Sequence, residues 1–278
     1  MILSSCVGVF DSSIAIDKIM GVLKNNGYQG IELLGEPKKY NLSEIKALLK
    51  EHSLSVTALT ACSRLKTGRD LASKDKQIRD RTIDHYKECL YLASELSTPL
   101  VGVTLTAVGR FQVEDDYQSE LQRALESLMI ISATAKKLKK TIIIETLNRY
   151  ASFMMNTVDE CKSFINSNHL SHVGICADLF HMNIEEGNLG ASIETAGNLL
   201  KNFHISDNNR RGIGYGHLDF KKIYQSLLKI QYSGPLALEA WASNKNPYNN
   251  QNNSFAEIEG YLIDFSKIIK NLSTDSLD

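Results

Sequence analysis

Three absences limit what this 278-residue chain can be. No apolar run approaches the roughly 20 residues that a membrane-spanning helix needs. Neither sign of charge is in excess, because 31 Lys and Arg residues stand against 32 Asp and Glu residues, and the composition therefore lacks the basic character of a nucleic-acid-binding protein. No C-x-x-C pair occurs among the five cysteines, which are Cys6, Cys62, Cys89, Cys161 and Cys176. We therefore expect a cytoplasmic protein with reduced, mostly buried thiols, no nucleic-acid partner and no membrane association.

Short apolar runs alternate with amphipathic stretches along the whole chain. The runs that read as strands lie near residues 2–9, 30–34, 54–60, 99–105, 141–146, 173–178, 202–206 and 235–240. The longest helical stretches cover about 74–97 and 114–140. Helix-start patterns occur at Asn41, Thr157 and Asp219, and Asn26-Gly27 is typical of a helix end. This alternation predicts an α/β protein with a parallel sheet.

Two architectures fit that alternation. A doubly wound open sheet would gather its ligands mainly at one switch point, whereas a (β/α)8 TIM barrel collects the ends of all its strands around one mouth. The chain is long enough for one barrel or two smaller domains, and no pattern indicates a domain boundary. We predict a single TIM-barrel domain over residues 1–278, since the polar residues described next come from consecutive strands.

Four apolar runs each end in a residue that can bind a metal or move a proton. They end at Glu145, Asp178, His204 and Glu239, and the barrel mouth would bring these four together. Carboxylates and an imidazole without thiolates suit Mn²⁺, Mg²⁺ or Co²⁺ better than a structural zinc site. We expect one divalent ion, Mn²⁺ first, with Mg²⁺, Co²⁺ or Zn²⁺ as alternatives.

The residues around these positions form more specific phrases. Residues 178–186 read Asp-Leu-Phe-His-Met-Asn-Ile-Glu-Glu, and residues 148–150 read Asn-Arg-Tyr. Both phrases resemble the D-tagatose/D-psicose (ketose) 3-epimerase family, within the xylose-isomerase-like sugar phosphate isomerase/epimerase barrels. The resemblance also reaches residues 30–33 and 70–75, so it covers most of the chain.

The resemblance implies a role for six side chains. Glu145, Asp178, His204 and Glu239 match the family's metal ligands, and His181 and Arg210 match its substrate-binding His and Arg. Glu145 and Glu239 would also be catalytic, with one removing a proton beside the carbonyl and the other returning a proton to the opposite face. The metal would stabilise the enediolate. The substrate would be a small sugar or keto-polyol, and a homodimer or homotetramer is expected.

One departure from the family leaves the substrate open. The family places a further carboxylate directly after the Asn-Arg-aromatic triplet, and this chain has Ala151 there. The segment 101–109 after the fourth strand also differs. A smaller, differently ended or differently substituted substrate is therefore compatible with the sequence.

Alternative functions use the same site. The apparatus would serve an aldose-ketose, hydroxypyruvate or inosose isomerase if the proton returned elsewhere, and a non-catalytic sugar-binding barrel is a further alternative. A metal nuclease on this barrel is disfavoured by seven His residues and a net charge of −1. Trp241 is a candidate pocket wall, His217 is a candidate pocket residue, and the Asn-rich segment 244–253 is either a loop over the mouth or a surface loop. His52, His85, His169 and His172 are expected at the surface or at helix ends.

Overall fold

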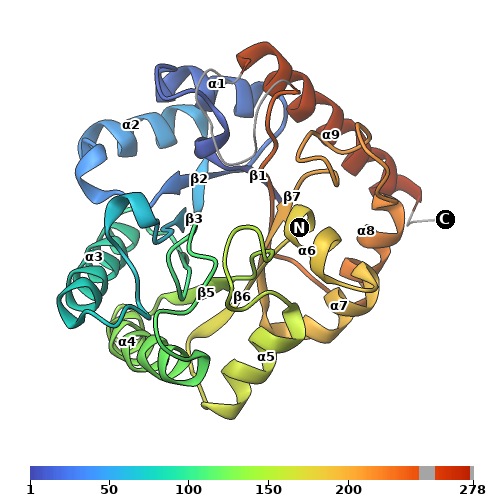
Figure 1. Cartoon of the computed structure of the whole chain (residues 1–278). Helices are drawn as coiled ribbons and strands as arrows, with labels where there is room; N and C mark the ends of the chain where they lie inside the picture. Colours follow the sequence, from blue (N-terminus) through green and yellow to red (C-terminus); the bar gives the residue numbers. More distant parts are fainter. Residues whose placement is uncertain (244–253, 276–278) are drawn as a thin grey trace.

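Eight parallel strands form a nearly closed barrel at the centre of the computed structural model, which describes residues 1–243 and 254–275 (Figure 1). The strands are β1 (Ile2–Ser5), β2 (Gly30–Leu34), β3 (Ser55–Thr60), β4 (Leu100–Val103), β5 (Thr141–Glu145), β6 (Val173–Asp178), β7 (Leu200–Ile205) and β8 (Pro235–Leu238). Neighbours follow the order β1-β8-β7-β6-β5-β4-β3-β2, so consecutive strands are paired. The TIM barrel predicted from the sequence is confirmed.

Helices form a ring around the barrel in chain order, with α6 inside the ring, and α9 completes the ring between α8 and α1 (Figure 1). They are α1 (Ile16–Asn25), α2 (Leu42–His52), α3 (Lys76–Glu95), α4 (Tyr117–Lys137), α5 (Val158–Ser167), α6 (Leu179–Glu185), α7 (Leu189–Ala196), α8 (Phe220–Lys229) and α9 (Phe255–Asp275). Short 3-10 turns lie at η1 (Val7–Val9), η2 (Pro37–Lys39), η3 (Leu65–Thr67) and η4 (Gly197–Leu199). The main apolar core lies between the strands and this ring.

The predicted helix-start residues act as caps. The Asn41 side chain accepts a hydrogen bond from the Glu44 backbone at 3.3 Å, and the Thr157 hydroxyl accepts one from the Glu160 backbone at 3.1 Å. Each bond satisfies an amide that the first helical turn leaves without an intrahelical partner. The left-handed Gly27 (φ +77°) follows the end of α1, in the conformation that favours glycine.

The sheet closes through few contacts between β1 and β2. An isolated bridge joins Cys6 to Glu32, and the Gln29 amide donates to the Leu3 carbonyl at 3.0 Å. The Gln29 side chain then accepts from the Leu3 amide at 3.0 Å, in place of a backbone partner. A side chain therefore completes the ladder where the first and second strands meet.

The floor of the barrel holds small polar side chains. The hydroxyls of Ser4 and Thr57 lie 2.7 Å apart, and since β1 and β3 are not neighbours this contact spans the interior. A methyl group on Gly30 would lie 2.4 Å from the Thr57 side chain, so only glycine leaves room for the pair. Above this floor the interior becomes more polar, and the site described below begins.

One expectation from the sequence is wrong. His85 is buried in α3, not at the surface, with its Nε2 3.6 Å from the Cys89 sulfur one turn later. All five cysteines are free thiols, and four of them are buried. Within the described residues, no helix combines the length and apolar character needed to cross a membrane. The Asn-rich segment 244–253 lies outside the described residues.

Candidate metal centre and substrate cavity

Four side chains from consecutive strands converge at the mouth of the barrel. Glu145 and Asp178 are the last residues of β5 and β6, His204 lies near the end of β7, and Glu239 directly follows β8. One ligand atom from each lies within 4.8 Å of the others. Asp178 and His204 are almost fully buried, and Glu145 is 8% exposed. The barrel geometry therefore brings together all four predicted ligands.

His204 Nδ1 is the centre of this cluster. It lies 2.8 Å from Glu239 Oε2, 3.3 Å from Glu145 Oε1 and 3.8 Å from Asp178 Oδ2. His204 Nδ1 is buried without a hydrogen-bond partner within the described residues, whereas Glu239 Oε2 has Arg210 Nη2 at 2.8 Å. An unpartnered buried polar atom is costly, and a divalent cation among the four side chains would give His204 Nδ1 a partner. The donor set therefore fits a hard or borderline divalent metal.

The charges around the cluster favour a positive ion there. Burial alone lowers the pKa of His204, but the acidic groups of Cys176, Cys6, Glu32 and Glu239 outweigh it and raise that pKa well above the usual value. Burial raises the pKa of Glu239, but the charges of Arg210 and His204 together lower this pKa by more, so the net shift is downward. Ionised carboxylates are the form that binds a metal.

A buried carboxylate below the cluster was missed by the sequence reasoning. Glu32 Oε2, from β2, lies 3.1 Å from His204 Nε2, and its Oε1 accepts from Asn202 at 2.7 Å. Cys6 and Thr60 also donate to Oε2, at 3.4 and 3.1 Å. Glu32 thus holds a proton on His204 Nε2, and Nδ1, which faces the three carboxylates, would be the nitrogen that gives up its proton when a cation binds, an arrangement common behind metal-binding histidines. The signal in the sequence was a charged residue inside the buried run 30–34.

Arg210 lies directly against two of the cluster's carboxylates. Its Nη1 is 2.6 and 2.5 Å from the two oxygens of Asp178, and its Nη2 is 2.8 Å from Glu239 Oε2. The backbone of Arg210 is left-handed (φ +63°), and it is held by a bond of 2.6 Å from the Trp241 amide to its carbonyl. The Phe180 ring covers the guanidinium at 5.0 Å. Strained backbone of this kind is frequent at functional sites.

His181 presents one nitrogen toward the cavity. Its Nδ1 accepts a hydrogen bond from the Asn148 backbone at 3.1 Å, so the proton of the neutral ring is on Nε2. Burial lowers the pKa of His181 and outweighs the effect of Asp178, so the ring is neutral at pH 7. Both predicted substrate-binding residues, His181 and Arg210, line the cavity.

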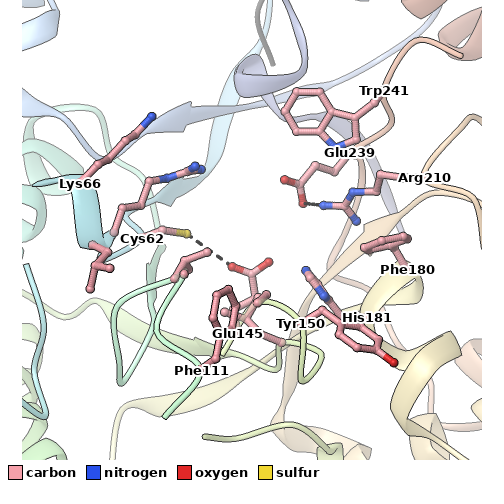
Figure 2. Close-up of a pocket in the computed structure, with 16 residues that line it drawn as sticks. Cys62, Lys66, Phe111, Glu145, Tyr150, Phe180, His181, Arg210, Glu239 and Trp241 are labelled. Carbon is pink, nitrogen blue, oxygen red and sulfur yellow. Dashed lines mark hydrogen bonds and ion pairs between the residues drawn. The ribbon is translucent and has the colours of Figure 1, made fainter. Parts of the chain in front are cut away.

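A cavity of about 650 Å³ opens above the cluster (Figure 2). Its sixteen lining residues are Cys62, Arg64, Leu65, Lys66, Val108, Gly109, Phe111, Glu145, Leu147, Tyr150, Ala151, Phe180, His181, Arg210, Glu239 and Trp241. Figure 2 shows Glu145 and Glu239 facing one another, with Cys62 donating to Glu145 Oε2 at 3.5 Å. A cavity of this size suits a small organic ligand.

Of the two other pocket candidates named from the sequence, one lines the cavity and one does not. Trp241 lines the cavity as expected, whereas His217 is exposed and does not line it. Cys62 and Tyr150 also line it, although sequence reasoning gave neither a role there.

The barrel and the cluster at its mouth define the class of protein. Residues 21–262 match the xylose isomerase-like TIM barrel family, and the chain belongs to that family.

Its relatives include characterised sugar epimerases. The chain is 31% identical over 245 residues to the 3-dehydro-D-guloside 4-epimerase of Escherichia coli (strain K12), covering 84% of this chain and 90% of that enzyme. It is 32% identical over 203 residues to a D-psicose 3-epimerase of Enterocloster bolteae, covering 72% of this chain and 66% of that enzyme. These relatives are isomerase-class enzymes that act on carbohydrates, and the family and class predicted from the sequence are confirmed.

Solved structures have the same architecture. A 3-keto-D-glucoside 4-epimerase from E. coli in its apo form matches with a TM-score of 0.81 at 25% identity, over 99% of each chain. A D-allulose 3-epimerase from Methylomonas sp., in complex with D-allulose, matches with a TM-score of 0.86 at 21% identity, over 98% of this chain and 96% of that one. The second likeness establishes the fold alone. The manganese preference, the oligomeric state and the cytoplasmic location stay predictions.

Proposed function

We propose that this protein is a divalent-metal-dependent epimerase of keto sugars that moves a proton on a carbon beside a carbonyl. The observation that carries this proposal is the cluster of four ligand atoms within 4.8 Å of one another, at the base of a cavity that holds both Glu145 and Glu239. Relatives named as 3-epimerases and 4-epimerases of sugars support it.

The proton transfer is assigned to two carboxylates. Glu145 and Glu239 face the same space from β5 and from the residue after β8, so one can take a proton from one face of a bound sugar while the other returns one to the opposite face (Figure 2). Inversion at that carbon follows. A divalent cation held by Glu145, Asp178, His204 and Glu239 would stabilise the negative charge that develops when the carbon loses its proton.

Two further side chains orient the sugar. Arg210 is a buried cation against Asp178 and Glu239, and it would hold sugar oxygens close to those carboxylates. The Nε2–H of the neutral His181 can donate a hydrogen bond to a sugar oxygen without moving a charge into the site. Both groups are fixed in place before a ligand arrives, which favours catalysis by lowering the cost of orientation.

Deuterium exchange tests the reaction. Metal-loaded protein is incubated in D₂O with D-psicose, D-fructose and a 3-keto-glucoside, and NMR follows exchange beside the carbonyl and the identity of each product. We expect exchange with inversion for at least one sugar, and a loss of about 100-fold or more in Glu145→Gln and Glu239→Gln, since a positioned acid or base contributes about 10²–10⁴-fold. Glu126→Gln, on the exposed face of α4, is the matched control.

The outcomes separate the alternatives. An aldose product would identify an aldose-ketose isomerase, and binding of sugars without exchange would indicate a sugar-binding barrel. Exchange that persists in both Gln variants would refute the two-carboxylate proposal. For the metal, elemental analysis should find less than one-tenth occupancy in Asp178→Asn and His204→Ala, and full occupancy of both variants would refute the ligand set.

A further inference from the structure

The cavity has opposite charges at its two ends. The two carboxylates that line it, Glu145 and Glu239, lie at the metal cluster. Arg64 and Lys66 line it elsewhere, on the loop after β3. Figure 2 shows Lys66 on the opposite side of the cavity from Glu239 and Arg210. A ligand that reaches from the cluster to this loop therefore meets Lys66, and Arg64 lies on the same loop.

These two cations have no ionic partner among the residues that the structure describes. Neither Arg64 nor Lys66 forms an ion pair or a side-chain hydrogen bond with any residue of the ranges 1–243 and 254–275. The neighbouring Arg69, by contrast, is paired with Glu36 at 2.5 Å. Residues 244–253, which follow the Trp241 wall in sequence, contain no Asp or Glu. Within the described ranges, no carboxylate therefore neutralises the positive charge at this end of the cavity.

The backbone that carries them is held rigidly. Arg64 forms a bridge with Val108, whose amide donates to the Ser63 carbonyl at 2.9 Å. The next loop joins the same wall, because the Gly109 amide donates to the Ala151 carbonyl at 2.8 Å. The loops after β3, β4 and β5 thus form one continuous wall. The fixed backbone keeps the origins of both side chains at the cavity wall, and the exposed side chains themselves carry the entropy cost of binding an anion.

Few other groups on this wall can recognise a polar ligand end. Ala151 is buried and carries no polar side-chain atom, and Leu65, Val108 and Leu147 are apolar. Besides the two cations, the polar side-chain groups that these loops add to the cavity lining are the Cys62 thiol, which donates to Glu145, and the Tyr150 hydroxyl. An anionic group would gain charge-assisted hydrogen bonds from a guanidinium and an ammonium.

We infer that the substrate is a keto sugar with an anionic group, a carboxylate or a phosphate, at the end remote from its carbonyl, and that Arg64 and Lys66 bind this group. The inference rests on the proposed function for the reacting end of the ligand. The volume of about 650 Å³ leaves room for a ligand larger than a free hexose. The two cations thereby determine specificity, while the residues of the cluster perform the chemistry.

Trp241 provides a measure of binding that does not depend on turnover. It is the one tryptophan of the chain and it lines the cavity. Metal-loaded protein is titrated with D-fructose, D-fructose 6-phosphate and D-fructuronate, which share one keto-sugar unit and differ at the far end. Trp241 fluorescence gives each Kd, and exchange in D₂O is measured on the same samples.

We expect at least one anionic sugar to bind about tenfold more tightly than D-fructose, since hydrogen bonds to charged groups are about twice as strong as neutral ones. The double variant Arg64→Gln/Lys66→Gln should reduce this preference to less than about threefold, and salt should weaken it in the wild type. The matched control Lys50→Gln/Arg81→Gln removes the same charges from exposed positions of α2 and α3 and should keep the preference.

Each result decides one of the two proposals. Equal Kd values for all three sugars, or a preference that survives the double variant, would overturn the anion site even if exchange is observed. Tight binding of the anionic sugars that depends on both cations, without any exchange, would support the anion site and refute the epimerase. A preference for phosphate over carboxylate, or the reverse, identifies which anion the site takes.

Discussion

Replacement of Glu32 by Gln should weaken metal binding although Glu32 itself faces away from the cluster. Its two carboxylate oxygens receive four donors, from His204, Asn202, Cys6 and Thr60. A glutamine amide keeps the shape but turns one oxygen into an NH₂ group. With the NH₂ group at the Oε1 position, the Asn202 amide must turn its own oxygen toward it, and at the Oε2 position the NH₂ group faces the donors His204, Cys6 and Thr60.

The expected magnitude follows from the position of that conflict. If the NH₂ group faces His204, the ring nitrogen Nε2 must accept, and the proton of the neutral ring moves to Nδ1, where the metal should bind. Changes to groups that orient a metal-binding histidine typically cost about 10–100-fold in affinity. Because Glu32 is almost fully buried, water cannot relieve the conflict. We therefore expect a loss of about 30–100-fold, which is about 2–3 kcal/mol.

Calorimetric titration with Mn²⁺ measures this affinity without any substrate. Circular dichroism first establishes that the metal-free variant is folded. Glu36→Gln is the control, since it removes the same charge four residues later from a half-exposed pair with Arg69. A folded Glu32→Gln protein that binds Mn²⁺ within threefold of the wild type would refute the positioning role.

Three further perturbations have defined outcomes. Arg210→Lys removes the planar guanidinium that contacts two carboxylates, so kcat/KM should fall at least about tenfold while calorimetry still finds bound metal. An unchanged kcat/KM would contradict the role of Arg210. Arg110→Met leaves the buried carboxylates of Asp70 and Glu120 without the guanidinium that lies 2.8 and 2.6 Å from them. Urea unfolding should then report a free energy of unfolding lower by about 3–5 kcal/mol, and a decrease below about 1 kcal/mol would contradict this reasoning. Because burial lowers the pKa of His85, the unfolded state takes up its proton first, and the free energy of unfolding should decline as the pH falls below about 6.5; His85→Gln should flatten this decline in calorimetry from pH 8 to pH 5.

The set of residues gathered at the mouth was predictable because these residues lie at strand ends. A buried apolar run that stops at Glu145 or Asp178 marks both the end of a strand and the group placed there, and a parallel barrel has only one arrangement of such ends. Strand limits were less accurate: the fourth was expected over 99–105 and is Leu100–Val103. The chain beyond it remains buried but leaves the sheet, which an apolar pattern cannot distinguish from a strand.

Residues that act across the barrel interior were harder to find. Glu32 and Asn202 touch one another although 170 positions separate them, and only the closed barrel makes them neighbours. His85 was misplaced for another reason. It shares a helix face with Thr82 and Cys89, so the helical period places it on the buried side of α3. The expectation of a surface position rests on the polarity of histidine alone.

The incomplete ladder between β1 and β2 connects metal binding to the closure of the barrel. Glu32 belongs to β2 and bridges Cys6, directly after β1, while its side chain reaches His204 on β7. Glu32, which would orient His204 as a metal ligand, thus also joins the first and second strands of the barrel. Loading of the metal should therefore slow hydrogen exchange of the amides along the first and second strands, even though neither strand contributes a ligand.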